Sequence, residues 1–157
     1  IDARWSYRSM LGGVLAQETD RAVETTAEMK PVTKVAPTAE ELTDLVFATK
    51  LVKHSKSNAI VLGKGGQLIA SGVGQTSRVD ALKQAIEKAR HFGFDLKGAV
   101  LASDAFFPFD DCVTLAAEAG ITAIAQPGGS VRDADSIAAA DRLGIAMVMT
   151  GVRHFKH

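Results

Sequence analysis

The sequence predicts an α/β fold in which a mixed sheet is flanked by helices. The second half of the chain alternates short apolar runs of strand length with longer segments whose apolar residues fall at helical spacing. The apolar runs contain almost no polar residues, which is typical of strands buried on both faces by helices. The chain has 157 residues, enough for one domain with a hydrophobic core. These three observations together predict the fold class.

Residues 1–37 are expected to be an irregular segment. It contains a short predicted strand near 12–17 and an extended connector at 30–37, which has prolines near both ends. The chain does not begin with Met, so we expect this segment to continue from an upstream part of a longer protein. The α/β domain itself is expected over residues 38–157.

The domain is predicted to begin with a helix at about 38–53. Thr38 followed by Glu41 forms a capping box, and the apolar residues behind it fall at helical spacing. Two apolar runs within 59–72 then surround Lys64-Gly65-Gly66, a pattern that predicts a β-hairpin.

The remaining elements alternate. Ser77 is positioned to cap a helix in which Val79, Leu82 and Ile86 line one face, and Gly93 is placed to end it. The other predicted elements are strands at 98–103, 121–125 and 145–150, and helices at about 109–119 and 132–143, which stop at Gly120 and Gly144.

An unusual loop follows each strand of the second half. Ligands bind outside the carboxyl ends of the strands in open α/β sheets, so these loops are expected to gather on one rim. The rim would carry aromatic rings, glycine amides, arginines, carboxylates and histidines, a combination that suits a flat heteroaromatic ligand with an anionic group. The loops read GVGQTSR (72–78), DAFFPFDD (104–111), QPGGS (126–130) and GVRHFKH (151–157).

Composition excludes several classes of protein. Eighteen Lys and Arg balance eighteen Asp and Glu, so the chain lacks the basic excess of a general nucleic-acid or membrane-surface binder. The single cysteine, Cys112, excludes a disulfide framework and a thiolate metal site. There is no signal-peptide pattern and no run of about eighteen apolar residues. We expect a soluble cytoplasmic protein.

The residues alone leave three alternatives open. The Phe cluster at 106–109 is either a core plug or a ligand platform. The segment 72–78 either binds an anion at a helix start or only caps the helix. The segment 126–130 is either a phosphate loop or a turn before a helix.

Several blocks resemble a known family. They are KSNAI (56–60), GVGQTSRV (72–79), ASDAFFPFDD (102–111), AQPGGSVRD (125–133) and GIAMVMTGVRHFKH (144–157). In this order they resemble the carboxyl-terminal part of the bifunctional purine biosynthesis proteins, which join AICAR formyltransferase to IMP cyclohydrolase. The resemblance implies a cytidine-deaminase-like fold, with residues 38–157 as the second lobe of the transformylase domain.

The resemblance also implies substrates and partners. The family moves a formyl group from 10-formyltetrahydrofolate, a co-substrate, to the 5-amino group of AICAR, and uses no metal for this chemistry. The product, FAICAR, is closed to IMP by a separate amino-terminal domain. Partners would be AICAR, a reduced folate, the missing amino-terminal lobe and cyclohydrolase domain, and a second copy in a homodimer, but neither nucleic acid nor a membrane.

Site residues follow from the resemblance position by position. The AICAR contacts would be Asn58, Arg78, Phe106 and Arg153. The folate contacts would be Val79, Asp111, Ser130 and Val131, with Asp111 bonding the amino edge of the pterin. His157 would support the reaction near the reacting groups.

Two features set this chain apart from a complete family member. The family's catalytic Lys-His pair belongs to the first lobe and has no counterpart here, so the chain alone is expected to be inactive. Asp110 and Cys112 differ from the residues usual in the family and flank the folate position. The alternative function is a folate- or nucleotide-binding or dimerisation module without catalysis. A nucleoside deaminase is disfavoured because the chain lacks Cys-x-x-Cys and His-x-Glu.

Overall fold

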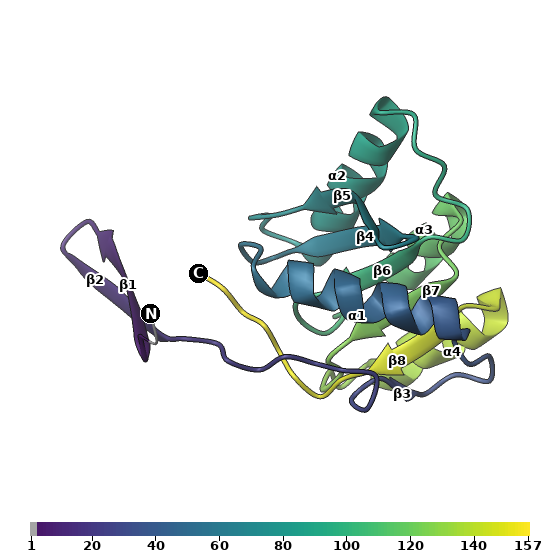
Figure 1. Ribbon diagram of the computed structural model, residues 1–157, viewed down its shortest axis with the longest axis horizontal. Coiled ribbons are helices and arrows are strands. Elements are labelled where there is room, and N and C mark those ends of the chain that lie inside the picture. Colours follow the sequence, from purple (N-terminus) through teal and green to yellow (C-terminus); the bar gives the residue numbers. More distant parts are fainter. Residues whose placement is uncertain (1–2) are drawn as a thin grey trace.

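The computed structural model describes residues 3–157. A hairpin precedes an α/β domain, which begins with a short strand and in which helices alternate with strands (Figure 1). The elements in chain order are β1 (Trp5–Met10), β2 (Gly13–Glu18), β3 (Lys30–Pro31), α1 (Ala39–Lys53), β4 (Ile60–Lys64), β5 (Gln67–Gly72), α2 (Arg78–His91), β6 (Val100–Ser103), α3 (Asp111–Ala119), β7 (Ala123–Gln126), α4 (Asp133–Leu143) and β8 (Ala146–Met149).

The main sheet is mixed, as the sequence predicts. Its strand order is β3-β8-β7-β6-β4-β5. Strands β6, β7 and β8 run parallel to one another, whereas β4 is antiparallel to both of its neighbours and β3 is antiparallel to β8. The helices that connect the parallel strands are required because parallel neighbours cannot be joined by a tight turn.

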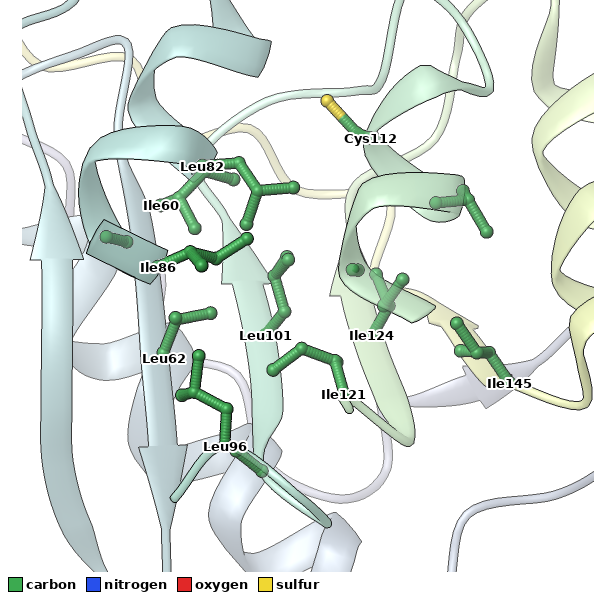
Figure 2. Close-up of a cluster of buried hydrophobic side chains, with 14 of the residues drawn as sticks. Ile60, Leu62, Leu82, Ile86, Leu96, Leu101, Cys112, Ile121, Ile124 and Ile145 are labelled. Carbon is green, nitrogen blue, oxygen red and sulfur yellow. The ribbon is translucent and has the colours of Figure 1, made fainter. Parts of the chain in front are cut away.

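Helices cover both faces of this sheet. Val61 of β4 belongs to a core cluster with Leu45 and Val52 of α1, while Ile60 and Leu62 belong to a second cluster beneath α2, α3 and α4. Successive residues of a strand point to opposite faces, so one apolar strand serves both cores. Figure 2 shows Ile60 and Leu62 in the second cluster. The α/β fold class predicted from the sequence is confirmed.

The helix boundaries agree closely with the sequence signals. Thr38 and Glu41 form both bonds of a capping box at the start of α1. Gly120 and Gly144 end α3 and α4 with left-handed backbone conformations, where a side chain would be strained. No helix among residues 3–157 is long and apolar enough to cross a membrane.

The prediction of an irregular amino-terminal segment is wrong for residues 5–18. Strands β1 and β2 form an antiparallel hairpin, in which the short strand expected near 12–17 is the second strand. Figure 1 shows this hairpin standing away from the α/β domain and joined to it by an extended linker. All six residues of β1 are exposed, and its sequence WSYRSM alternates apolar with polar residues only over the first four positions, so the strand signal is short.

Candidate functional site

The unusual loops meet at one edge of the sheet, as predicted. Ile60, the first residue of β4, pairs with Gly72 at the end of β5 and with Ser103 at the end of β6. Strands β7 and β8 run parallel to β6, so their carboxyl ends, Gln126 and Met149, lie at the same edge. Four loops and the segment before β4 therefore border one region of the surface.

Asp104 is the buried centre of this edge. It directly follows β6, and its side chain is fully inaccessible to solvent. Its carboxylate accepts hydrogen bonds from the Arg78 guanidinium, from the Ser57 hydroxyl at 2.5 Å and from the Ala59 backbone amide at 3.2 Å. A buried carboxylate requires such donors because leaving water without them is very unfavourable.

Arg78 connects this carboxylate to Asn58. Its Nη1 atom donates to Asp104 and to the Ala59 carbonyl at 3.2 Å, and its Nη2 atom donates to Asn58 Oδ1 at 3.0 Å. Asn58 Nδ2 donates to the Gln75 carbonyl at 3.0 Å. Both ends of the Asn58 amide are thus oriented, and Nδ2 keeps a second hydrogen that can be donated to a ligand.

The Arg78 side chain is itself only 5% exposed. It is therefore a buried support of Asn58 rather than a surface cation, and a direct contact with a nucleotide stays a prediction. The Nε atom of Arg78 is buried and has no hydrogen-bond partner among the described residues.

The three Phe side chains of the loop after β6 have different environments. Phe107 is completely buried, and its amide donates to the Gln126 side chain at 3.0 Å, so this residue is the core plug. Phe106 is 36% exposed and remains available as a ligand contact. Phe109 is half exposed, with the guanidinium of Arg132 5.3 Å from its ring centre. Phe107 therefore fills the core, whereas a ligand contact by the exposed rings stays a prediction.

The predicted folate contacts lie in the first turns of α2 and α3 and in the turn before α4, all at the same edge. Asp111 is the first residue of α3 and is exposed, and Val131 is fully exposed before α4. Ser130 and Val79 are partly buried, Val79 against the core beneath α2. Nothing in these positions tests a folate role, which stays a prediction.

Two helix starts that could have bound anions are occupied by the chain's own side chains. The Asp133 carboxylate accepts from the amides of Gly129 at 2.7 Å and Ser130 at 3.1 Å. At α2, the Ser77 hydroxyl accepts from the Asp80 amide. The segment 126–130 therefore forms a turn before a helix, and Ser77 in 72–78 caps a helix, whereas anion binding at these segments stays a prediction.

Cys112 is buried against the same core. Burial, and next to it the negative charge of Asp111, raise the pKa of this thiol to about 12. The side chain is thus a small packed residue, as expected. Figure 2 shows it at one end of the apolar cluster.

The carboxyl-terminal tail, residues 151–157, borders two cavities. One, of about 220 Å³, is lined by Lys53, His54 and His157 together with residues of the β1–β2 hairpin. The other, of about 590 Å³, is lined by Arg153 and by residues 17–22. Arg153 and His157, the two predicted site residues of the tail, are both exposed.

Of the predicted site residues, the structure joins Asn58 and Arg78 directly by a hydrogen bond. Sequence reasoning placed Asp104 on the rim but assigned it no role, although a single Asp directly after a fully apolar strand was a usable signal. It also missed the contacts of His154 with Asp20 and Glu24. No sequence signal could have found these, because the partners are 130 or more positions apart.

Comparison with known proteins gives consistent results. The chain is 66% identical over 151 residues to the bifunctional purine biosynthesis protein PurH of Bacteroides thetaiotaomicron, covering 96% of this chain and 30% of the relative. It is 55% identical to PurH of Aquifex aeolicus, covering 98% of this chain and 30% of that protein. The chain therefore spans about a third of the length of these curated relatives.

Two solved structures also resemble the chain. A diaminohydroxyphosphoribosylaminopyrimidine deaminase and reductase of Thermotoga maritima is 25% identical, with a TM-score of 0.49 over 69% of this chain and 34% of that chain. The dCMP deaminase of cyanophage S-TIM5 is 18% identical, with a TM-score of 0.48 over 63% of this chain and 88% of that chain. At the sequence level, residues 2–88 match the AICARFT/IMPCHase bienzyme family. The extent of this match, together with the identity to PurH over nearly the whole chain, shows that the chain belongs to that family.

Proposed function

We propose that this chain is the carboxyl-terminal lobe of an AICAR formyltransferase. In this role it would contribute to the transfer of a formyl group from 10-formyltetrahydrofolate to AICAR in IMP synthesis, within a longer cytoplasmic protein that also carries IMP cyclohydrolase activity. The proposal is carried by the family membership, combined with the gathering of four loops and Asn58 at one edge of the sheet.

The reaction explains which groups the site needs. The 5-amino group of AICAR attacks the formyl carbon and a tetrahedral oxyanion forms. The amine then loses a proton, the bond from the formyl carbon to N10 breaks, and tetrahydrofolate leaves with a proton on N10. The amine is a weak nucleophile because its lone pair is delocalised into the imidazole carboxamide. A base for the proton, donors for the oxyanion and accurate positioning of both substrates are therefore all required.

We assign this chain mainly the positioning of substrates. Asn58, oriented by Arg78 and Gln75, would donate its second Nδ2 hydrogen to the AICAR carboxamide. Phe106 would lie against the nucleotide, and Arg153 would bond its anionic group. Asp111, Ser130, Val131 and Val79 would face the folate, with His157 near the reacting groups.

The catalytic base is assigned to the absent lobe. Lys53 and His54 are adjacent, but the Lys53 side chain is only 9% exposed, and its ammonium donates to the Ala22 carbonyl and lies 4.0 Å from Asp20. The amino group of Lys53 is thus engaged by the chain's own groups rather than directed at a substrate. The chain by itself is therefore expected to bind substrates without turning them over.

Isothermal titration calorimetry on the 157-residue chain tests the proposal. AICAR and a reduced folate should each release or absorb measurable heat. Asp111→Ala should weaken folate binding at least tenfold and change AICAR binding little, because a carboxylate that bonds the pterin edge contributes about 1.5–3 kcal/mol. Glu118→Ala, an exposed carboxylate later in the same helix, is the matched control.

Three outcomes would contradict parts of the proposal. Absence of heat with either ligand would contradict substrate binding by this lobe. If Asp111→Ala lost equal affinity for AICAR and for folate, Asp111 would have a structural role. Formyl transfer by the purified chain at the rate of a complete enzyme would contradict the assignment of the base to the missing lobe. The proposed homodimer is tested separately by sedimentation, where a monomer at high concentration would count against it.

A further inference from the structure

His154 holds the carboxyl-terminal tail through both nitrogens of its ring. Nδ1 lies 2.5 Å from Asp20 Oδ2, and Nε2 lies 2.9 Å from Glu24 Oε2. The ring is buried, and the side chain of Glu24 is 1% exposed. Each ring nitrogen thus has a carboxylate oxygen as its hydrogen-bond partner.

Lys53 adds a contact to the same cluster. Its Nζ atom lies 4.0 Å from Asp20 Oδ1. The Oε1 atom of Glu24 is buried with no hydrogen-bond partner among the described residues, so Glu24 depends on His154 for a hydrogen-bond partner.

The contact connects segments that are distant in the sequence. Asp20 and Glu24 belong to the linker between the β1–β2 hairpin and the sheet, 134 and 130 positions from His154. The backbone amide of His154 also donates to the Asp104 carbonyl at 2.9 Å. One residue therefore attaches the tail to the linker by its side chain and to the buried centre of the site by its backbone.

Burial of His154 fixes its neighbours on the tail. In an extended chain, alternate side chains point to opposite sides. Accordingly, the guanidinium of Arg153 lies 5.2 Å from the ring centre of Phe155, and both line the larger cavity. Two residues after His154, the Lys156 amide donates to the Ser57 hydroxyl at 3.0 Å. This hydrogen bond keeps His157 at the smaller cavity.

We propose that His154 is a positioning residue, whose two-sided contact with Asp20 and Glu24 fixes the tail and so presents Arg153 and His157 to the cavities. The roles of Arg153 and His157 rest on the proposed function. The contact of His154 with Asp20 and Glu24, and the effect of this contact on the order of the tail, are independent of the proposed function.

Nuclear magnetic resonance of the 157-residue chain with ¹⁵N-labelled histidine tests the contact. Both ring nitrogens of His154 should show the chemical shifts of nitrogens held in hydrogen bonds, whereas a ring nitrogen that contacts only water would overturn the proposal. In His154→Gln, backbone amide hydrogens 154 and 156 should exchange at least tenfold faster, because the tail loses its side-chain anchor. His91→Gln, the same change at an exposed helical position, should leave both amides unaffected.

A milder variant keeps the proposal testable if His154→Gln does not fold. Glu24→Gln keeps the side-chain volume and should speed exchange at amides 154 and 156 at least threefold, with the amides of β6 and β7 unchanged. Unchanged exchange at 154 and 156 would overturn the proposal.

Calorimetry separates this inference from the proposed function. AICAR should bind His154→Gln at least tenfold more weakly than the unmodified chain. If AICAR bound His154→Gln and the unmodified chain equally well although the tail of the variant was disordered, the proposal that the contact presents Arg153 and His157 to the ligand would be overturned. Failure of the unmodified chain to bind AICAR would contradict the proposed function instead, while the resonance and exchange results would still decide the contact of His154.

Discussion

The guanidinium of Arg78 and the carboxylate of Asp104 form an ion pair that is almost completely removed from water. The Arg78 side chain is 5% exposed and that of Asp104 is 0% exposed. They belong to α2 and to the loop after β6, and the pair also orients Asn58 and receives the Ser57 hydroxyl. It is thus the point where the core of the domain meets the candidate site.

Removing the charge of Asp104 should destabilise the fold. Asp104→Asn leaves the buried Arg78 cation without its partner, and breaking one side of a buried pair costs about 3–5 kcal/mol. Urea unfolding followed by circular dichroism measures the change in the free energy of unfolding.

The exposed pair of Arg132 and Asp135 provides the control for that experiment. Its side chains are about half exposed, so Asp135→Asn should change the free energy of unfolding by less than about 1 kcal/mol. If Asp104→Asn and Asp135→Asn changed the free energy of unfolding by similar amounts, burial would not be the reason why Asp104 stabilises the fold.

Gly72 should be irreplaceable at the end of β5. A Cβ atom at this position would lie 1.8 Å from the carbonyl oxygen of Ala81 in α2, and backbone atoms of a packed helix cannot move aside easily. Gly72→Ala should therefore cost about 1–3 kcal/mol or more, measured by thermal or urea unfolding.

Gly63 in the neighbouring strand offers a matched comparison. The nearest atom to a Cβ there is 3.5 Å away, an ordinary contact, so Gly63→Ala should be clearly milder. Equal destabilisation at both positions would show that the close approach of β5 to α2 is not the cause.

Cys112 should be almost unreactive in the folded protein. Its pKa of about 12 means that only about one thiol in ten thousand is ionised at pH 8, and the thiolate is the nucleophile. Alkylation by iodoacetamide should be very slow in native buffer and fast in urea. Because the charge of Asp111 also raises this pKa, Asp111→Asn should speed native alkylation. Rapid labelling of the unmodified native chain would contradict burial of the thiol.

Asp133 should stabilise the turn before α4. Its carboxylate accepts from the amides of Gly129 and Ser130, which otherwise lack a described partner at this helix start. Asp133→Ala should lower the free energy of unfolding by about 0.5–2 kcal/mol and speed hydrogen exchange at these two amides. Asp133→Asn, which keeps a carbonyl acceptor, should be milder, and no difference in exchange between the two variants would argue against the acceptor role.

Much of the fold was predictable because its signals are local. The capping box of Thr38, the glycines that end α3 and α4, and the glycine turn between β4 and β5 each depend on residues within a few positions of one another. The hairpin of β1 and β2 was not predicted as such. Its strands are mostly exposed, and the alternation of apolar and polar residues in β1 covers only four positions, too few for a clear strand signal.

The candidate site was predictable only in part. The sequence placed the loops on one rim, since the carboxyl ends of neighbouring parallel strands meet at one edge of a sheet. The resemblance singled out Phe106 as a ligand contact, but the sequence did not show that Phe107 is buried while Phe109 is half exposed. It also did not show that Asp133 occupies the glycine amides of the turn before α4.

The sequence by itself determined where the helices of the α/β domain begin and end and which strands are apolar, because these depend on backbone conformation and burial over a few residues. The tertiary structure decided which charges meet. Asp104 pairs with Arg78 across 26 positions, and His154 pairs with Asp20 across 134. Such pairs form only after the order of strands in the sheet brings the segments together, and burial then makes each partner necessary to the other.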